Sequence, residues 1–434
     1  MKDRIANIYA FMMNEEDART CADISEEACR NVPLNFILII ISNTFTKFGD
    51  ALSNPKTVLA WLMSYINAPI YLIGFLVPVR ESLSMLPQIV IASYIRRKEV
   101  RKWVWILGSI MQSAAIACIA VTALFFKGST AGWLILGFLI IFSLSRGLCS
   151  VSSKDIIGKT IPKTRRGRLN GYSTSISGVL VLAAGLFIAL YAGANSGIEF
   201  YSYLIFFASL MWVLAAFVYS AIKEYKGETS GGGNALREAI DRLNLLKSDK
   251  PFRNFVIARA LLLCSALTAP FYVVLSQTYV GKEISILGIF VIAGGISSSL
   301  SAPFWGRMAD VSSKRVMVNA ALITSLLGIL MFMLVTWVPF LRENYWLYPA
   351  AFFILGIAHS GVRLGRKTYI IDMAGGNKRT DYVAVSNTVI GIILLLTGGI
   401  SALASLISPE GIIMVLSLFG LVGAYQSTRL PDVE

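Results

Sequence analysis

Residues 103–126 read WVWILGSIMQSAAIACIAVTALFF, a run of 24 residues without a charged side chain. An α-helix that spans a bilayer needs about 20 consecutive, mostly apolar residues. The 434-residue chain is 56% apolar and only 15% charged, and its mean hydropathy is +0.67. Eleven further apolar windows fall near residues 34–62, 68–95, 131–155, 169–192, 199–222, 254–280, 284–305, 315–338, 345–366, 382–407 and 409–428. The sequence therefore predicts an all-α polytopic membrane protein with twelve transmembrane helices.

Lysine and arginine are divided unevenly between the two sets of loops. The loops after the second, fourth, sixth, eighth and tenth windows hold 25 of them, whereas the opposite loops hold Lys127, Lys282 and Arg342. Because these residues collect in short cytoplasmic loops, we expect both termini in the cytoplasm and a plasma membrane of the bacterial inner-membrane type. Topology and attraction to anionic lipid then explain the net charge of +14 without a nucleic-acid partner.

The windows divide the chain into two halves around a polar centre. We expect a cytosolic segment at 1–33, a six-helix bundle at 34–222, a cytosolic central loop at 223–253, a second six-helix bundle at 254–428 and a cytosolic tail at 429–434. The central loop holds a flexible SGGG stretch and then ALREAIDRLNLL (235–246), whose apolar spacing predicts an amphipathic helix. Residues 2–13 predict a similar surface helix.

Two local features qualify this plan. Asn54-Pro55-Lys56 interrupts the first window, so we expect that helix to be tilted or broken at Pro55. Five scattered cysteines without a C-x-x-C pair, and a single histidine, predict neither a disulfide framework nor a metal site.

The second half repeats the first at an offset of 213 residues. This offset places Lys154 on Lys367 without a gap across 25 positions, and it places Arg146 on His359. Repeated halves are typical of secondary transporters, in which the binding site lies between the halves near the midplane. The sequence therefore predicts two pseudo-symmetric six-helix bundles with a shared site.

The stretch GRMADVSSKR at 306–315 resembles the G-x-x-x-D-x-x-x-[KR]-[KR] loop of the major facilitator superfamily. This resemblance implies alternating access between two bundles. It also implies a cytoplasmic latch in which the aspartate pairs with the other bundle, formed here by Gly306, Asp310, Lys314 and Arg315. The first-half counterpart, SYIRRKEVRK at 93–102, lacks both the glycine and the aspartate.

A second resemblance concerns the kind of transport. Arg146 and the small residues that follow it are similar to the fourth-span signature of proton-coupled members of this superfamily. The fifth-span Gly-Pro signature of drug antiporters is absent.

Charged side chains inside the predicted spans are costly and normally face the bundle interior. Asp50 and Glu81 are the candidate proton-carrying acids, because desolvation and a movable cation act in opposite directions on a buried carboxylate. Asp50 with Arg80, or Glu81 with Arg146, are expected neighbours. The alternative is that these pairs only fix helix packing.

Cationic and polar side chains supply candidates for substrate binding. Arg80, Arg146 and His359 are expected to form a floor for an anionic substrate, since guanidinium groups hold carboxylate or phosphate in a bidentate manner. Further cavity candidates are Lys47, Tyr172, Tyr272 and Gln277. Arg363, Arg366, Lys367 and Asp372 are interpreted as inside-positive anchors of the tenth span.

Enzyme motifs are missing. Gly158-Lys159-Thr160 resembles the end of a P-loop, but Ser153 stands where the leading glycine is required. We therefore expect no enzyme and no cofactor, but a monomeric secondary transporter that moves a small organic solute by proton-coupled symport or antiport within membrane lipid. An uncoupled facilitator, a flippase for an amphiphile or lipid, and a transport-inactive sensor or scaffold remain alternatives.

Overall fold

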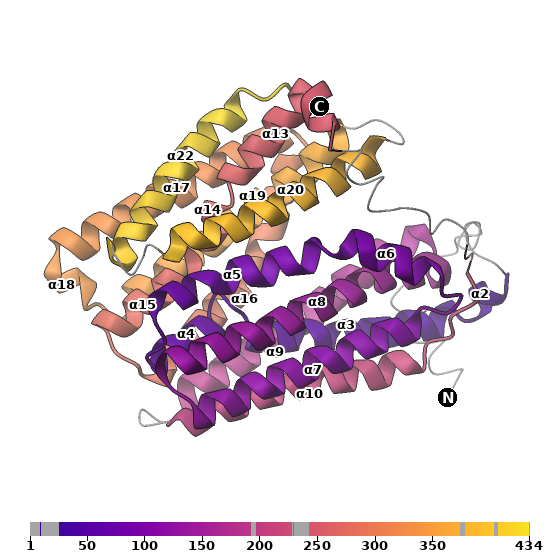
Figure 1. Ribbon diagram of the computed structural model, residues 1–434, viewed down its shortest axis with the longest axis horizontal. Helices are drawn as coiled ribbons and strands as arrows, with labels where there is room; N and C mark the ends of the chain where they lie inside the picture. The colour runs from indigo at the N-terminus through magenta and orange to yellow at the C-terminus, as the bar shows by residue number, and fades with distance from the viewer. Residues whose placement is uncertain are drawn as a thin grey trace.

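Two helical bundles make up the computed structural model of the chain (Figure 1). It describes residues 9, 26–191, 197–227, 229, 243–373, 378–402 and 407–433. Twelve helices in these ranges are long and apolar enough to cross a membrane, as predicted. The predicted surface helix at 2–13 lies outside the described residues apart from Tyr9, and the SGGG stretch and most of 235–246 lie outside them as well.

The first bundle begins after the short helix α2 (Glu26–Arg30). Its six spans are formed by α3 (Val32–Leu52) with α4 (Val58–Tyr65), α5 (Ile70–Met85) with α6 (Gln88–Arg96), α7 (Lys102–Phe125), α8 (Gly128–Thr160), α9 (Lys163–Tyr191) and α10 (Ile198–Ser220). Helix α7 packs against α8 and α10, and α3 packs against α9 and α10. Large apolar side chains such as Phe125 and Phe217 remain exposed on the outside, where lipid would cover them.

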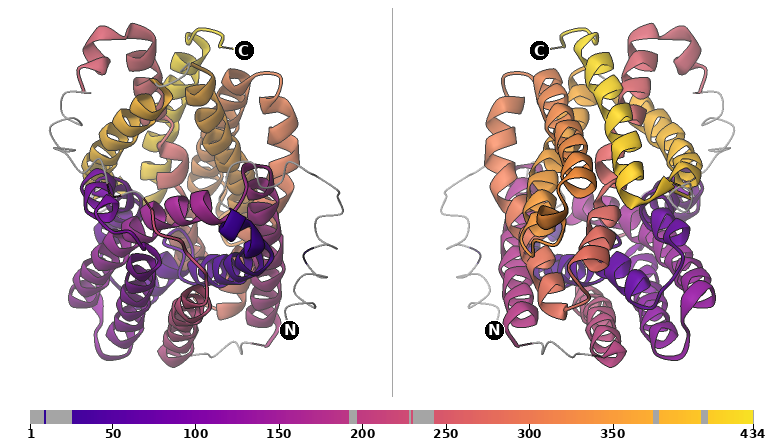
Figure 2. Two further views of the ribbon diagram at one scale, coloured as in Figure 1. Left: turned by 90° about the vertical axis from the view of Figure 1, so that its right-hand side faces the viewer. Right: turned by 90° about the vertical axis from the view of Figure 1, so that its left-hand side faces the viewer.

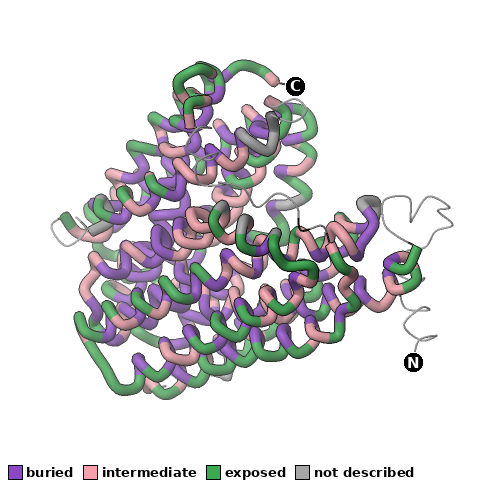
Figure 3. The backbone as a smooth tube through the Cα atoms, turned by 45° about the vertical axis from the view of Figure 1, so that its right-hand side comes forward, coloured by how far each residue is buried: buried purple, intermediate pink, exposed green. Residues whose placement is uncertain are grey.

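The second bundle follows the short helix α12 (Leu245–Ser248). Its spans are formed by α13 (Lys250–Leu261), α14 (Cys264–Leu267) and α15 (Ala269–Tyr279) together, then α16 (Ile284–Ala309), α17 (Ser313–Trp337), α19 (Leu347–Met373), α20 (Lys378–Ala402) and α22 (Pro409–Thr428). The single-turn α18 (Pro339–Arg342) joins α17 to α19. Buried residues line the inside of both bundles and exposed ones their outside (Figure 3).

Both bundles interrupt their first span at equivalent positions. In the first bundle α3 ends at Leu52 and α4 begins at Val58. The Asn54 side chain accepts a hydrogen bond from the Lys56 backbone (2.8 Å), an Asx turn around Pro55. The offset of 213 places Pro55 on Thr268, where α14 gives way to α15. The predicted break at Pro55 is therefore present, and it has a counterpart in the other half.

The two bundles touch most extensively along two pairs of spans, α9 with α16 and α5 with α20, and they also touch where α4 meets α15. In the first pair the backbones meet almost directly, because a Cβ on Gly288 would lie 2.5 Å from the Ala189 nitrogen and 2.8 Å from the Gly185 oxygen. Such contacts need glycine. The bundles converge at the end that carries α4, α15 and α18 and diverge toward α6, α13 and the C-terminus (Figures 1 and 2). We call the diverging end, which carries the lysine- and arginine-rich loops, the basic face, and the other end the opposite face.

One expectation about cysteine is wrong. Cys29 is disulfide-bonded, whereas Cys118, Cys149 and Cys264 are free thiols. The prediction rested on the absence of a C-x-x-C pair. A single disulfide requires only that two Cα atoms approach to about 4–7 Å, which no spacing rule excludes.

Candidate functional site

Two arginines, each from a different helix of the first bundle, form ion pairs with Asp50 of α3. Arg80 of α5 donates to Asp50 Oδ1 (3.0 Å), and Arg146 of α8 donates to both carboxylate oxygens (2.5 Å each). The Arg80 guanidinium also lies 4.7 Å from the centre of the Phe142 ring. The expected pairing of Asp50 with Arg80 is present. Arg146 forms its ion pair with Asp50, and it lies near Glu81, as expected, through an electrostatic interaction without an ion pair. One carboxylate is thus shared by two guanidinium groups.

A hydrogen-bond chain crosses between the bundles at the break of the first span. Lys56 Nζ lies 3.0 Å from His359 Nε2, and His359 Nδ1 lies 3.2 Å from Ser265 Oγ. Ser265 in turn donates to the Leu262 carbonyl (3.0 Å). Because a lysine ammonium is only a donor, we assign Nε2 as the acceptor and the ring proton to Nδ1. His359 is therefore held as a neutral ring between one residue from each bundle.

Glu81 lies beside this chain, next to cations of both bundles. It interacts electrostatically with Lys56 and Arg80 of the first bundle and with Arg366 of α19. Within the described part of the chain, no side chain donates a hydrogen bond to its carboxylate or forms an ion pair with it. Glu81 is therefore a carboxylate near several cations and bonded to none of them.

Arg363 and Arg366 belong to this cluster, which the interpretation of these residues as membrane anchors missed. Both interact electrostatically with Lys56 and with His359, although Arg363 is exposed. The side chain of Lys367, one residue further along α19, lies within range of Lys154 of α8, its counterpart in the repeat. The signal available from sequence was their spacing, because positions 359, 363 and 366 share one face of a helix.

Arg259 is a further intramembrane cation, and its partners are neutral. Its side chain is buried and donates to Ser386 Oγ (2.6 Å) and Asn387 Oδ1 (2.8 Å) of α20. These bonds tie α13 to α20 within the second bundle.

Of the four other predicted cavity residues, Lys47 interacts electrostatically with Asp50. Lys47 donates to Thr174 Oγ1 (2.5 Å), which joins α3 to α9. Tyr172 packs at the edge of an apolar cluster inside the first bundle. Tyr272 is fully buried, and its hydroxyl has no hydrogen-bond partner among the described residues. Gln277 donates to the Trp61 carbonyl (3.0 Å) of the other bundle.

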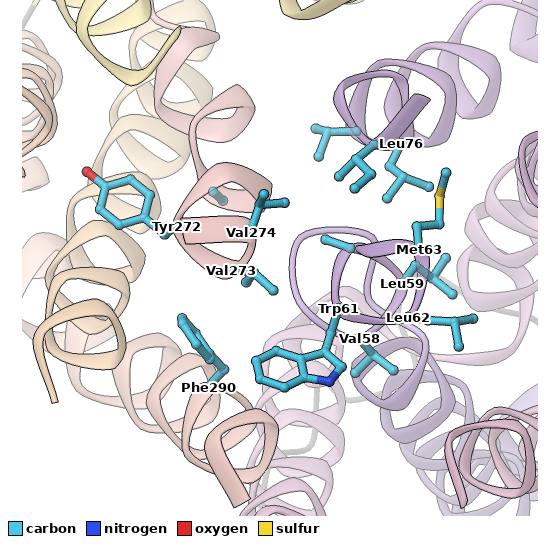
Figure 4. Packing of buried hydrophobic residues seen from close by; sticks show 14 of the residues in the cluster. Val58, Leu59, Trp61, Leu62, Met63, Leu76, Tyr272, Val273, Val274 and Phe290 are labelled. Carbon is cyan, nitrogen blue, oxygen red and sulfur yellow. The ribbon is translucent and has the colours of Figure 1, made fainter. Parts of the chain in front are cut away.

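Apolar side chains close the opposite face between the bundles (Figure 4). Trp61 of α4 points toward Val273 and Phe290 of the second bundle, and the rings of Trp61 and Phe290 are 6.4 Å apart. The Trp61 indole donates to the Tyr201 hydroxyl (3.1 Å). These contacts block passage to the charged cluster from the opposite face.

Polar contacts add to this closure. Lys282 donates to Asn67 Oδ1 (3.0 Å) and to the Ser64 carbonyl (3.3 Å) at the end of α4. Partial burial lowers the pKa of the Lys282 amine. A cavity of about 560 Å³ beside these contacts is lined by residues of α4, α5 and α15, Gln277 and Lys282 among them.

The loop expected to latch the cytoplasmic side does not do so in this conformation. Asp310 is exposed, and within the described residues its carboxylate forms no ion pair. Lys314 pairs with Asp432 near the C-terminus (3.0 Å), inside its own half of the chain. The physical reason is that the bundles diverge at this face (Figure 1). The latch of Gly306, Asp310, Lys314 and Arg315 stays a prediction for a conformation that is closed there.

Known proteins resemble the chain in structure and not in sequence. No family model and no curated protein matches the sequence. A D-xylose-proton symporter aligns with a TM-score of 0.69 at 13% identity, covering 92% of this chain and 99% of its own. A POT family transporter in complex with a thioalcohol-conjugated peptide gives 0.68 at 10% identity, with 90% and 94% covered. The nucleoside transporter NupG gives 0.65 at 13% identity, with 91% and 99% covered.

A further matched structure belongs to a named superfamily. It is the major facilitator superfamily proton:xylose symporter XylE bound to 6-bromo-6-deoxy-D-glucose, with a TM-score of 0.59 at 13% identity, covering 94% of this chain and 97% of its own. At such identities the likeness concerns the fold. Twelve spans, two bundles and nearly full coverage agree with the resemblance of the 306–315 loop. The chain is an integral membrane protein with the fold of the major facilitator superfamily transporters.

Proposed function

We propose that this protein is a secondary active transporter that moves a small organic anion by alternating access, coupled to protons. The observation that carries the proposal is the arrangement around Asp50 and Glu81. Two carboxylates lie among a larger number of cations, at the junction of two bundles that are closed at one face and diverge at the other. Structural neighbours that carry sugars, nucleosides or peptides support the general activity.

The proposal of proton coupling rests on which bundle carries each cation. Arg80 and Arg146 approach Asp50 from α5 and α8, while Glu81 has Lys56 on its own bundle and Arg366 on the other. A nearby cation favours the charged form of a carboxylate, and desolvation favours the neutral form. A rocking motion that moves Arg366 away from Glu81 would shift that balance. One structural neighbour is a D-xylose-proton symporter, which supports the same view.

An anionic substrate follows from the sign of the cluster. The cluster holds more cations than acids: Asp50 and Glu81 lie among Lys56, Arg80, Arg146, Arg363 and Arg366. Uncompensated charge is costly in a low-dielectric interior. A negatively charged solute would relieve that cost, whereas a cation would add to it.

The positive-inside bias supports the cytoplasmic side for the basic face, which makes this conformation open toward the cytoplasm. In that orientation both termini are cytoplasmic, in a plasma membrane of the bacterial inner-membrane type. The partners of the protein are then the solute, protons and lipid, and the two-bundle chain works as a monomer.

Proteoliposomes with a pH-sensitive dye inside test the proposal. Pools of organic anions, cations, sugars and lipids are added outside, and we expect anions to evoke proton movement that Glu81→Gln abolishes. Glu199→Gln is the matched control, because Glu199 is exposed at the start of α10, away from the site. Solute flux without proton movement would show an uncoupled facilitator. Binding without any flux would show a sensor.

A further inference from the structure

The cations of the cluster fall into two groups, those that form an ion pair with a carboxylate and those that do not. Arg80 and Arg146 share Asp50. Within the described residues, Arg363 and Arg366 make neither a hydrogen bond nor an ion pair, and Lys56 bonds only the neutral ring of His359 through its side chain. All three lie within electrostatic range of one another. A guanidinium with five donors and no partner is the group that proteins use to bind carboxylate or phosphate.

The local charge balance sets the charge of the missing partner. Asp50 offsets one of its two arginines. While it is ionised, Glu81 offsets one charge among Lys56, Arg363 and Arg366, which leaves two positive charges near His359; a protonated Glu81 leaves all three. A singly charged solute would leave at least one of them uncompensated, and a neutral solute would leave all of them.

We infer that Lys56 of the first bundle and Arg363 and Arg366 of the second form a binding site for a small organic dianion, a dicarboxylate or a phosphate ester, with His359 between them. The inference rests on the proposed transport of an anion and assigns its charge and its ligands. Because the site joins both bundles, an anion bound there would draw them together.

The same site explains how substrate and proton would be linked. Glu81 interacts electrostatically with Lys56 and Arg366 without bonding either. In the absence of substrate, its negative charge therefore compensates part of their positive charge. A substrate anion would compete with Glu81 for these two cations. Arg80 and Arg146, which already share Asp50, would remain near Glu81. A carboxylate that loses part of its compensating positive charge binds a proton more readily, so binding of the dianion and of the proton would favour each other.

Exposed cations lead from the basic face to this site. Lys154 of α8 and Lys367 of α19 lie within range of each other, and Lys367 is in turn near Arg363 and Arg366. Two lysines from opposite bundles repel one another when nothing lies between them. A row of like charges that ends at a site also raises the local concentration of an oppositely charged solute.

Binding to the purified protein in detergent tests the inference without any proton gradient. Thermal unfolding is followed at constant ionic strength with succinate, sn-glycerol 3-phosphate, lactate or xylose. We expect succinate or glycerol phosphate to raise the unfolding temperature, and lactate and xylose to leave it unchanged. The two dianions together distinguish a dicarboxylate site from a phosphate site.

Two variants separate binding from folding. Arg366→Gln should weaken dianion binding by roughly 10-fold to 100-fold, the value of a charge-assisted hydrogen bond. Lys127→Gln, an equal change of charge at an exposed loop of the opposite face, should have no effect. Glu81→Gln should bind the dianion at least as tightly as the unaltered protein, because it removes the internal competitor, and binding should lose its pH dependence.

Several results would overturn the inference. They are equal stabilisation by lactate or xylose, no stabilisation by either dianion, or an unaltered affinity in a folded Arg366→Gln protein. Proton-coupled uptake of a neutral or singly charged solute in proteoliposomes, with any of these results, would leave the proposed coupling intact and remove only the dianion site.

Discussion

The two bundles treat their inner cations differently. In the first bundle, Arg80 and Arg146 share Asp50, and toward the basic face the Lys159 ammonium lies 3.0 Å from the fully buried Glu224 carboxylate. In the second bundle, Arg259 donates to neutral side chains, and Arg363 and Arg366 have no bonded partner among the described residues. Two halves with one repeat pattern have therefore diverged in electrostatics. The first bundle holds its two inner arginines in ion pairs with Asp50, whereas the inner arginines of the second bundle have no carboxylate partner among the described residues.

The largest effect is expected where one carboxylate holds two cations. Asp50→Asn would leave Arg80 and Arg146 without a counter-charge, which should abolish proton-driven uptake and lower the free energy of unfolding by about 3 kcal/mol or less. Uptake and chemical unfolding of the purified protein measure the two effects. Asp50→Glu, which keeps the charge, should retain part of the uptake and part of the stability. Asp432→Asn, at an exposed residue near the C-terminus, is the control. Normal uptake by Asp50→Asn would break the comparison.

A matched pair of arginine variants sharpens the difference between paired and unpaired cations. Arg146→Gln should lower the free energy of unfolding by about 1–3 kcal/mol, because Asp50 loses the Nη1 donor that contacts both of its oxygens. Arg363→Gln should change it by less than about 0.5 kcal/mol, since its exposed side chain has no bond to lose. In uptake assays both should be impaired. Equal destabilisation by the two variants would contradict the division between the bundles.

The contact between the bundles tests whether they move as units. A Cβ on Gly288 would lie 2.5 Å from the Ala189 nitrogen, so Gly288→Ala should push α16 away from α9. We expect about 10-fold slower transport with little change in ligand affinity, measured as turnover and as binding in detergent. Gly137→Ala is the control, because a Cβ there meets nothing within 4 Å. An unaltered turnover in Gly288→Ala would show that the bundles do not pivot at this contact.

Lys282 should give the smallest effect, because this cation of the second bundle contacts neutral oxygens and the Tyr65 ring of the first bundle and no carboxylate among the described residues. Lys282→Gln should make the free energy of closing the opposite face less favourable by about 0.5 kcal/mol, the value of an exposed polar contact. Accessibility to a membrane-impermeant reagent of a cysteine introduced at Ile73, a buried residue that lines the adjacent cavity, would measure this change. Arg342→Gln is the control at the same face. Reduced accessibility in Lys282→Gln would contradict a closing role.

The sequence predicted the spans, the repeat, the break at Pro55 and the pairing of Asp50 with Arg80. These depend on hydropathy and on local chemistry, which each stretch of chain carries by itself. It did not predict that Lys56 would contact His359, or that Arg363 and Arg366 would interact electrostatically with these two residues. Those facts depend on how far each helix is rotated about its axis and on how the bundles dock. Near a helix end, an arginine that contacts lipid headgroups and an arginine that binds a ligand cannot be distinguished by the residues around them in the sequence.

The glycine contact at Gly288 has a mechanical consequence. Where two backbones meet without side chains between them, the bundles have a fulcrum whose position is fixed. Helix α16 continues from there to Ala309 at the basic face, a lever arm of about 30 Å at 1.5 Å per residue. A rotation of about 10° at the fulcrum would sweep its far end by about 5 Å, roughly one helical turn. Small rearrangements near the closed face are thereby magnified into a passage wide enough for a hydrated ion at the other.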